Sequence, residues 1–504
     1  MANSNHSLLR SRAWRGLASI PALACCFSGI ACSDANETSE PSGAIAPASP
    51  AASAPTQATE PAAPGAGTAN EPTGAAPQST GSGERAPSGV ALTPANTNPP
   101  GSATGPTNEP TATPPGPATN GPLPLVFDQE NTGADCPASP APPAFAALTP
   151  IPNLPDPFLL SSGARMTSRD QWRCRRSEIG SLIQFWGTGP KGAPPSNLSA
   201  TLAGNRLTVV VTQNGASITL TSTINLPSGP GPFPLVIGMN APTGSLPAGI
   251  FTGVATMTFT DSQLVANDFN VTRAAGTYFS MYPDRNTGAM IEWAWGVSRL
   301  IDGLYQTADQ NNIDLKHIGV TGCSFQGKMA LYAGAFDERI ALVIPEESGG
   351  GGEASWRFMA TQTGTEDLEA AQGTAWYAQN LLQFKNADAP KLPFDMHELV
   401  AMVAPRAILA IENTGIDRLG SQAGSVSMRA AAEVYKGLGI ADRIGFSQTQ
   451  APAHCQFPTV QTPEVQAFVD KFLLDKTSAN TSVARDAYHT DLSPWVTWST
   501  PELN

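Results

Sequence analysis

The sequence predicts an α/β fold whose mostly parallel central sheet is covered by helices on both faces. Three apolar runs, 233–240, 339–348 and 406–413, have the composition of strands that are buried on both sides. Segments with helical periodicity stand between such runs, the clearest over 288–306. Alternation of strands and helices along the chain is typical of this architecture.

A hairpin is expected over residues 206–227. Residues 206–213 and 217–227 are rich in alternating β-branched side chains, as paired strands are. The strand over 233–240 follows and ends in Gly and Asn. In the helix over 288–306, six large apolar side chains share one face: Met290, Trp293, Val297, Leu300, Ile301 and Leu304.

The rest of the chain continues the alternation. Further strands are expected at 317–324, 339–348, 406–413 and 443–449. Further helices are expected at 325–336, 427–439 and 463–476. Catalytic groups of an open parallel sheet lie beyond the carboxyl ends of its strands. A site is therefore expected in the loops that follow these strands.

Residues 1–32 are predicted to be an export signal. Three arginines precede an apolar run over 16–32, which is short and poor in large aliphatic residues for a membrane span. The run ends at Cys32, and a small residue followed by Cys resembles a bacterial lipoprotein cleavage site. Lipid attachment at Cys32 and simple secretion both stay open. In either case we expect a secreted or cell-surface protein, with an outer-membrane lipoprotein as one form.

Residues 33–125 are predicted to be a disordered linker. This segment is built from Pro, Ala, Thr and Gly, with almost no large apolar residues. It cannot bury enough surface to offset the entropy of ordering. Residues 126–504 remain as one domain of catalytic size, expected to be a monomer. The formal net charge of −13, without a visible cluster of Lys and Arg, argues against a nucleic-acid partner.

Ser324 is the candidate nucleophile. It follows an apolar strand and precedes a helix, which is the setting of the nucleophile elbow of α/β-hydrolases. Gly322 and Gly327 supply the small neighbours that a tight turn needs. The spacing G-x-S-x-x-G is one residue longer than the common elbow. The alternative is a serine that only caps the helix or fills the turn.

The base has to come from five histidines. His6 lies in the signal, His317 starts the strand that leads to Ser324, and His397 lies in a helix-like segment. The order nucleophile, acid, base of α/β-hydrolases leaves His454 and His489. We favour His454, because it stands on a loop after a predicted strand, whereas His489 lies in the polar C-terminal tail. A purely structural His454 is the alternative.

The acid should follow the next strand, where Glu346, Glu347 and Glu353 stand. Neighbouring side chains of a strand point to opposite faces, so only one of Glu346 and Glu347 can readily face the histidine. Local reasoning does not choose between them. No cofactor or metal is expected, since the chain has no His, Cys and Asp cluster at ligand spacing.

Four cysteines lie in the domain, and an even number in an exported protein suggests two disulfides with three pairings. Cys323 is adjacent to Ser324, and Cys455 is adjacent to His454. If these two pair, the bridge joins the base to the nucleophile. Cys136 would then pair with Cys174 and hold the start of the domain.

Residues 320–357, VTGCSFQGKMALYAGAFDERIALVIPEESGGGGEASWR, resemble the core of the glucuronoyl esterases. These enzymes cleave the ester between 4-O-methyl-glucuronic acid on xylan and lignin alcohols. Further blocks, including LPFDMHELVAMVAPRAILAIEN and HCQFP, follow in family order, so the resemblance covers nearly all of 136–476. It implies an α/β-hydrolase three-layer sandwich.

The resemblance also implies roles for individual residues. Ser324 would be the nucleophile, His454 the general base and Glu347 the acid. Lys328 would match the lysine that holds sugar hydroxyls. The disulfides would be Cys323–Cys455 and Cys136–Cys174.

The sequence departs from the family at several positions. Phe325 stands where the family has an Arg that helps stabilise the oxyanion, so only the backbone N–H of Phe325 is left to donate. Arg418 replaces a Trp that contacts the sugar. Segment 365–376 has no clear counterpart of the Gln and Glu that contact the sugar. The third family disulfide is absent, with Ser355 and Ser427 at its positions.

Three functions are therefore considered. The first is an exported serine esterase that cleaves 4-O-methyl-glucuronoyl esters between xylan and lignin. The second is an esterase for another carbohydrate ester, such as acetylated xylan, since Phe325 and Arg418 alter the site. The third is a weakly active carbohydrate-binding relative on a tethered stalk.

Overall fold

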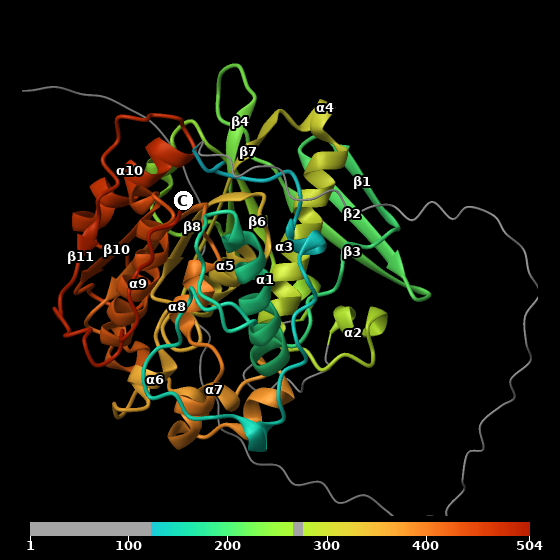
Figure 1. The fold of residues 1–504 in the computed structure, drawn as a ribbon. Helices are drawn as coiled ribbons and strands as arrows, with labels where there is room; N and C mark the ends of the chain where they lie inside the picture. Colours follow the sequence, from blue (N-terminus) through green and yellow to red (C-terminus); the bar gives the residue numbers. More distant parts are fainter. Residues whose placement is uncertain (1–121, 266–275) are drawn as a thin grey trace, which may run out of the picture. The chain divides into compact units, whose positions relative to one another are not determined.

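A seven-stranded sheet forms the centre of the computed structural model (Figure 1). The structure describes residues 122–265 and 276–504, so the predicted export signal, Cys32 and the linker up to residue 121 lie outside the described residues. Every neighbouring pair of strands is parallel. The order is β11 (Ala484–Arg485), β10 (Ile444–Thr449), β9 (Ala407–Asn413), β8 (Ile340–Glu346), β7 (Ile313–Cys323), β4 (Phe233–Met239) and β6 (Ala255–Phe259).

The central strands bury side chains on both faces of this sheet. On β8, Leu342 and Ile344 belong to one hydrophobic core and Val343 belongs to the other. On β9, Ile408 and Leu409 divide in the same way. Successive side chains of a strand point to opposite faces, so a strand between two cores must be apolar at nearly every position.

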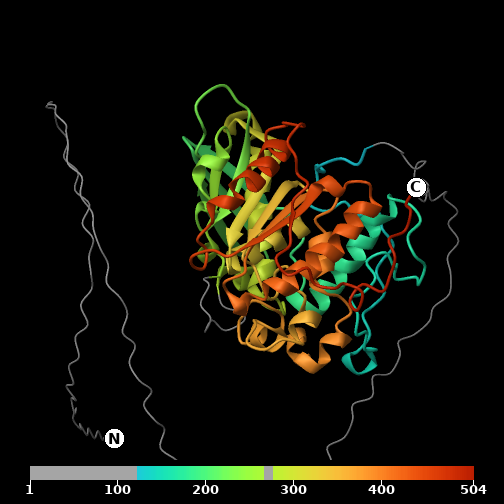
Figure 2. The same cartoon turned by 90° about the vertical axis from the view of Figure 1, so that its left-hand side faces the viewer.

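Helices cover both faces (Figure 2). On one face, α10 (Thr462–Phe472) packs against β8 and β9. The other face carries α3 (Ala289–Gln306), α5 (Phe325–Phe336), α8 (Met396–Ala401) and α9 (Ser421–Gly437), with α1 (Gln171–Ile183) packed on α8. The predicted α/β-hydrolase three-layer sandwich with a parallel sheet is confirmed.

A separate antiparallel sheet lies beside α3, at the right of Figure 1. It contains β1 (Leu198–Ala203), β2 (Arg206–Gln213) and β3 (Ala216–Thr223), and the pair β2–β3 is the predicted hairpin. A Cβ atom on Gly303 of α3 would lie 2.4 Å from Val209 Cγ2, so the missing side chain is what lets strand and helix approach.

The remaining elements are short. They are β5 (Pro242–Ser245), α2 (Thr277–Met281), α4 (Ala308–Asn311), α6 (Trp356–Met359) and α7 (Leu368–Gln372). Within 122–265 and 276–504, none of the helices has the length and apolar character needed to cross a membrane.

The first described residues are held to the domain by polar contacts. The Arg443 guanidinium donates to the carbonyl oxygens of Leu123 and Pro124 at 2.8 and 2.9 Å. A disulfide joins Cys136 to Cys174 of α1, with 5.3 Å between their Cα atoms. The start of the domain is therefore attached both covalently and by hydrogen bonds.

Candidate active site

Ser324 occupies the turn between β7 and α5. Its backbone has φ +62° and ψ −130°, a conformation that a residue with a side chain rarely adopts. Its N–H donates to Glu346 O at 2.9 Å, and its carbonyl accepts from Lys328 N at 3.0 Å. A strained serine between strand and helix is the arrangement of a nucleophile elbow.

Two glycines make this turn sterically feasible. A Cβ atom on Gly322 would lie 2.5 Å from Gln326 O, and one on Gly327 would lie 2.6 Å from Glu346 O. Both contacts are with backbone oxygens, which cannot move without distorting the turn. The small residues that the sequence places around Ser324 are therefore required by close backbone approach.

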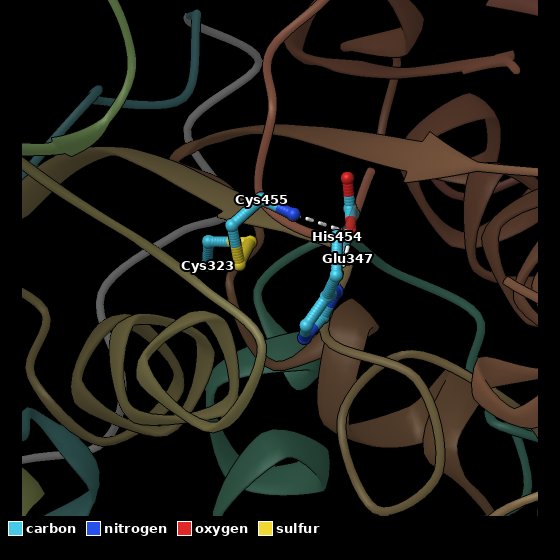
Figure 3. A group of neighbouring side chains, drawn as sticks. All are labelled: Cys323, Glu347, His454 and Cys455. Atoms are coloured by element: carbon cyan, nitrogen blue, oxygen red, sulfur yellow. Dashed lines mark hydrogen bonds and ion pairs between the residues drawn. A yellow bond between two sulfur atoms is a disulfide. The ribbon is translucent and has the colours of Figure 1, made fainter. Parts of the chain in front are cut away.

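His454 and Glu347 form a hydrogen-bonded pair (Figure 3). His454 Nδ1 lies 2.6 Å from Glu347 Oε2, which also accepts from Cys455 N at 3.0 Å. Glu347 is buried, and its own N–H donates to Ile411 O of β9 at 2.7 Å. With Nδ1 facing the carboxylate, the imidazole can offer its Nε2 to a nucleophile.

A disulfide links the loop of the histidine to the elbow of the serine. Cys323 and Cys455 are joined (Figure 3), with 5.8 Å between their Cα atoms and a sequence separation of 132. In the chain-entropy model, closing so long a loop stabilises the fold by roughly 4–5 kcal/mol. The bridge joins the chain neighbour of Ser324 to the chain neighbour of His454.

These side chains also resemble a metal-binding cluster in their spacing. One ligand atom from each of Cys323, Glu347, His454 and Cys455 lies within 4.8 Å of the others. The two sulfurs are bonded to each other, however, and only a thiolate is a good metal ligand. With two of its four donor atoms bonded to each other, the cluster is poorly suited to hold a metal ion.

The other two candidate acids point elsewhere. Glu346 lies on the opposite side of the chain and accepts a hydrogen bond from Ser245 Oγ. Glu353 Oε1 accepts from Gly349 N at 3.1 Å, within the loop that follows Glu347. Among the three carboxylates left open by the sequence, Glu347 is the one that contacts His454.

Burial makes Glu346 sensitive to pH. Desolvation raises the pKa of its carboxyl from 4.5 to about 7. The hydrogen bond from Ser245 lowers this pKa, and the negative charge of Glu347 raises it. The folded protein therefore holds a proton that the unfolded chain releases between pH 4.5 and 7. Stability falls over this range as the pH rises, by up to about 3 kcal/mol.

A Glu346→Gln variant should lack this pH-dependent loss of stability. We expect the difference in free energy of unfolding, variant minus wild type, to become more positive by about 1–3 kcal/mol between pH 4.5 and pH 8. Urea unfolding of both proteins at the two pH values measures the difference. If the free energy of unfolding changed equally with pH in both proteins, Glu346 would not be the source of the pH dependence.

The remaining described histidines have structural surroundings. His317 Nδ1 lies 2.8 Å from Asp314 Oδ2. His397 is buried with its Nε2 2.9 Å from Pro155 O, and burial lowers the pKa of its imidazole to about 4. His489 is exposed in the C-terminal tail. His6 lies outside the described residues.

Phe325, the first residue of α5, packs into an aromatic group. Its ring stacks on Trp376 at 6.1 Å between centroids, and lies 6.1 Å from the Trp293 ring. The side chain offers no hydrogen-bond donor to the site. Any contribution of Phe325 to an oxyanion must come from its backbone N–H.

Glu366 is a residue of the site region to which the sequence analysis gave no role. Its Oε2 accepts from Lys328 Nζ at 3.1 Å, and its Oε1 pairs with the Arg418 guanidinium. It lies in the segment 365–376, for which the resemblance offered no clear counterpart. An acidic residue near Lys328 could not be inferred, because loop residues between helices carry no periodic signal.

Comparisons with known proteins agree with this architecture. A family model described as "Glucuronyl esterase, fungi" matches residues 209–439. A 4-O-methyl-glucuronoyl methylesterase from Hypocrea jecorina is 39% identical over 379 residues, 74% of this chain and 80% of that protein. One from Podospora anserina is 36% identical over 393 residues, 76% of this chain and 80% of that protein.

Solved structures show the same similarity. The glucuronoyl esterase catalytic domain from Hypocrea jecorina has a TM-score of 0.68 and 39% identity, covering 72% of this chain and 100% of that chain. A mutant glucuronoyl esterase from Sporotrichum thermophile was solved in complex with methyl 4-O-methyl-beta-D-glucopyranuronate. It has a TM-score of 0.68 and 35% identity, and the match covers 73% of this chain and 100% of that chain.

The parallel sheet between helical layers, with a strained serine after its interior strand β7, defines the protein as an α/β-hydrolase. Its relatives are carboxylic ester hydrolases, and so is this protein. The chain belongs to the glucuronoyl esterase family.

Proposed function

We propose that this protein is an exported serine esterase that hydrolyses 4-O-methyl-glucuronoyl esters between xylan and lignin alcohols. The observation that carries the proposal is the pairing of His454 with Glu347 beside a disulfide that joins Cys455, the neighbour of His454, to Cys323, the neighbour of Ser324. A nucleophile, a base and an acid that orients the base are the components of acyl transfer. The similar esterase that was solved with a methyl glucuronate ester supports the substrate class.

In the proposed reaction, His454 Nε2 accepts the proton of Ser324 Oγ as the oxygen attacks the ester carbonyl. Glu347 holds the imidazole by Nδ1 and stabilises the imidazolium that forms. The backbone N–H of Phe325 donates to the oxyanion. The imidazolium then protonates the leaving alcohol. A water molecule, activated by the same histidine, hydrolyses the acyl-enzyme and releases the uronic acid.

Lys328 and Arg418 are proposed to bind the sugar part of the substrate. Lys328 lies in the first turn of α5, and its N–H donates to Ser324 O at 3.0 Å. Arg418 and Lys328 both contact the Glu366 carboxylate, but the Arg418 side chain is half exposed. One cation is buried and the other lies near the surface. Both could donate hydrogen bonds to the hydroxyls of a sugar ring that extends from the reacting carbonyl towards solvent.

A second candidate is an esterase for another carbohydrate ester, such as acetylated xylan. It is favoured by Phe325, whose ring packs on Trp376 and supplies no charged donor at the position after Ser324. Export, with or without a lipid at Cys32, and a monomeric state stay predictions from the sequence.

The two candidates differ in the substrate they prefer. For the purified protein, we expect kcat/KM for a benzyl glucuronate ester to exceed that for acetylated xylan by at least about 100-fold. Initial rates of alcohol and acetate release at matched concentrations give both values. A preference for the acetyl ester would overturn the glucuronoyl assignment in favour of the second candidate.

A further inference from the structure

One carboxylate joins the two cations of the proposed sugar site. Glu366 accepts from Lys328 through Oε2 and from Arg418 through Oε1. The side chains of Lys328, Glu366 and Arg418 are 1%, 25% and 51% exposed. The Lys328–Glu366–Arg418 cluster therefore extends from the buried interior to the surface, and it carries one net positive charge.

The backbone places Glu366 independently of its side chain. Its N–H donates to Arg418 O at 2.6 Å. A Cβ atom on Gly350 would lie 1.8 Å from Glu366 O, and Gly350 belongs to the loop that follows Glu347. The main chain at residue 366 is thus fixed between the loop of the proposed triad acid and residue 418. A change of the side chain alone leaves these contacts in place.

The buried ammonium of Lys328 depends on this carboxylate. An ammonium removed from water is unfavourable unless it is paired. Glu366 Oε2 lies 3.1 Å from Lys328 Nζ, which also lies 5.2 Å from the centre of the Trp376 ring. An ammonium has three N–H donors, so it can bind Glu366 and a substrate hydroxyl at the same time. The direction of the carboxylate then decides where the other donors point.

Arg418 depends on Glu366 in a different way. Its guanidinium is half exposed, and an exposed long side chain samples many rotamers when nothing holds it. The ion pair with Glu366 removes much of this freedom before substrate arrives. Pre-ordering of a binding group reduces the entropy lost on binding.

We propose that Glu366 is a positioning residue that orients the Lys328 ammonium and holds the Arg418 guanidinium at the rim for the sugar hydroxyls of the substrate. The proposal rests on the proposed function. It predicts that the outer part of the site recognises the sugar by directed hydrogen bonds from cations. Glu366 acts on binding through these two residues and takes no part in the proton transfers at Ser324 and His454.

Glu366→Gln tests the proposal, because glutamine keeps the size and one acceptor oxygen but loses the charge. We expect KM for the benzyl glucuronate ester to rise about 10-fold or more, with kcat within about 3-fold of the wild type. A general loss of structure would not produce this split between KM and kcat. Glu369→Gln is the matched control, since Glu369 lies nearby on α7 and pairs with exposed Lys385 at 3.7 Å.

A double-mutant cycle tests the route of the effect. If Glu366 acts partly through Arg418, the double variant E366Q/R418Q should raise KM by less than the product of the two single effects. Multiplying effects, or an unchanged KM in E366Q, would overturn the proposal. Should E366Q fold poorly, R418Q alone decides: Arg418 is half exposed, and an unchanged KM in that variant would also overturn it. A wild type without esterase activity would instead refute the proposed function.

Discussion

Replacing Ser324 by Ala is expected to lower kcat for a benzyl glucuronate ester by about 10⁴–10⁶-fold. Without Oγ, no acyl-enzyme can form, and only binding and the remaining backbone donors can assist attack by water. The strained backbone at φ +62° is set by Gly322, Gly327 and the hydrogen bond from Ser324 N to Glu346 O, none of which needs the hydroxyl. KM should therefore change much less than kcat. Stopped assays of alcohol release, with long incubation for the variant, measure the loss.

The control for this prediction is a buried serine elsewhere in the fold. Ser425 of α9 donates to Asp486 Oδ1 at 2.9 Å and has no contact with the proposed triad among the described residues. Ser425→Ala should keep kcat within about 3-fold, although it loses a buried hydrogen bond. A fluorophosphonate probe should label the wild type and S425A but not S324A. An S324A enzyme that retains more than about 1% of kcat would exclude Ser324 as the nucleophile.

The fold was predictable where burial dictates the sequence. Strands β4, β8 and β9 lie between two cores, so their residues are apolar almost throughout and stand out from their surroundings. Strand β11 was not predicted, because its two residues, Ala484 and Arg485, are exposed and carry no pattern. Strand β6 was missed as well: its five residues do alternate between buried and half-buried, but so short a run is a weak signal.

The candidate site was predictable only in part. Ser324 is recognisable because the glycines and the strand before it are local signals. The choice between Glu346 and Glu347 was open, because strand periodicity stops at Glu346, where β8 ends. Glu347 then adopts φ +47°, which turns its side chain towards His454. A single backbone angle outside a regular element decides the identity of the acid, and no periodic pattern encodes it.

Glu366 shows the same limit at longer range. Its partners Lys328 and Arg418 are 38 and 52 residues away in sequence. The contact between them depends on how the loop after Glu347 meets residue 366 through Gly350. Since this loop has four consecutive glycines, its path is determined by packing and not by local preference. The charged cluster could therefore be found only in three dimensions.

A Glu347→Gln variant is expected to lower kcat by about 10³–10⁴-fold while leaving KM within about 3-fold. An amide at this position can still accept the N–H of Cys455, so the loop of His454 keeps one of its contacts. The amide cannot, however, stabilise an imidazolium, and its NH₂ group facing Nδ1 would favour the wrong tautomer of His454. The rate of acyl transfer should fall without a loss of substrate binding.

The neighbouring carboxylate provides the control for this variant. Glu346→Gln changes the same functional group one residue earlier, but on the side of the chain that faces Ser245. It should retain kcat within about 3-fold while changing the pH dependence of stability. Both variants keep the disulfide between Cys323 and Cys455, so a difference between them reports on the side-chain contact with His454. If E346Q lost as much kcat as E347Q, the reaction would depend on buried carboxylates at the end of β8 in general, and not on the Glu347–His454 pair.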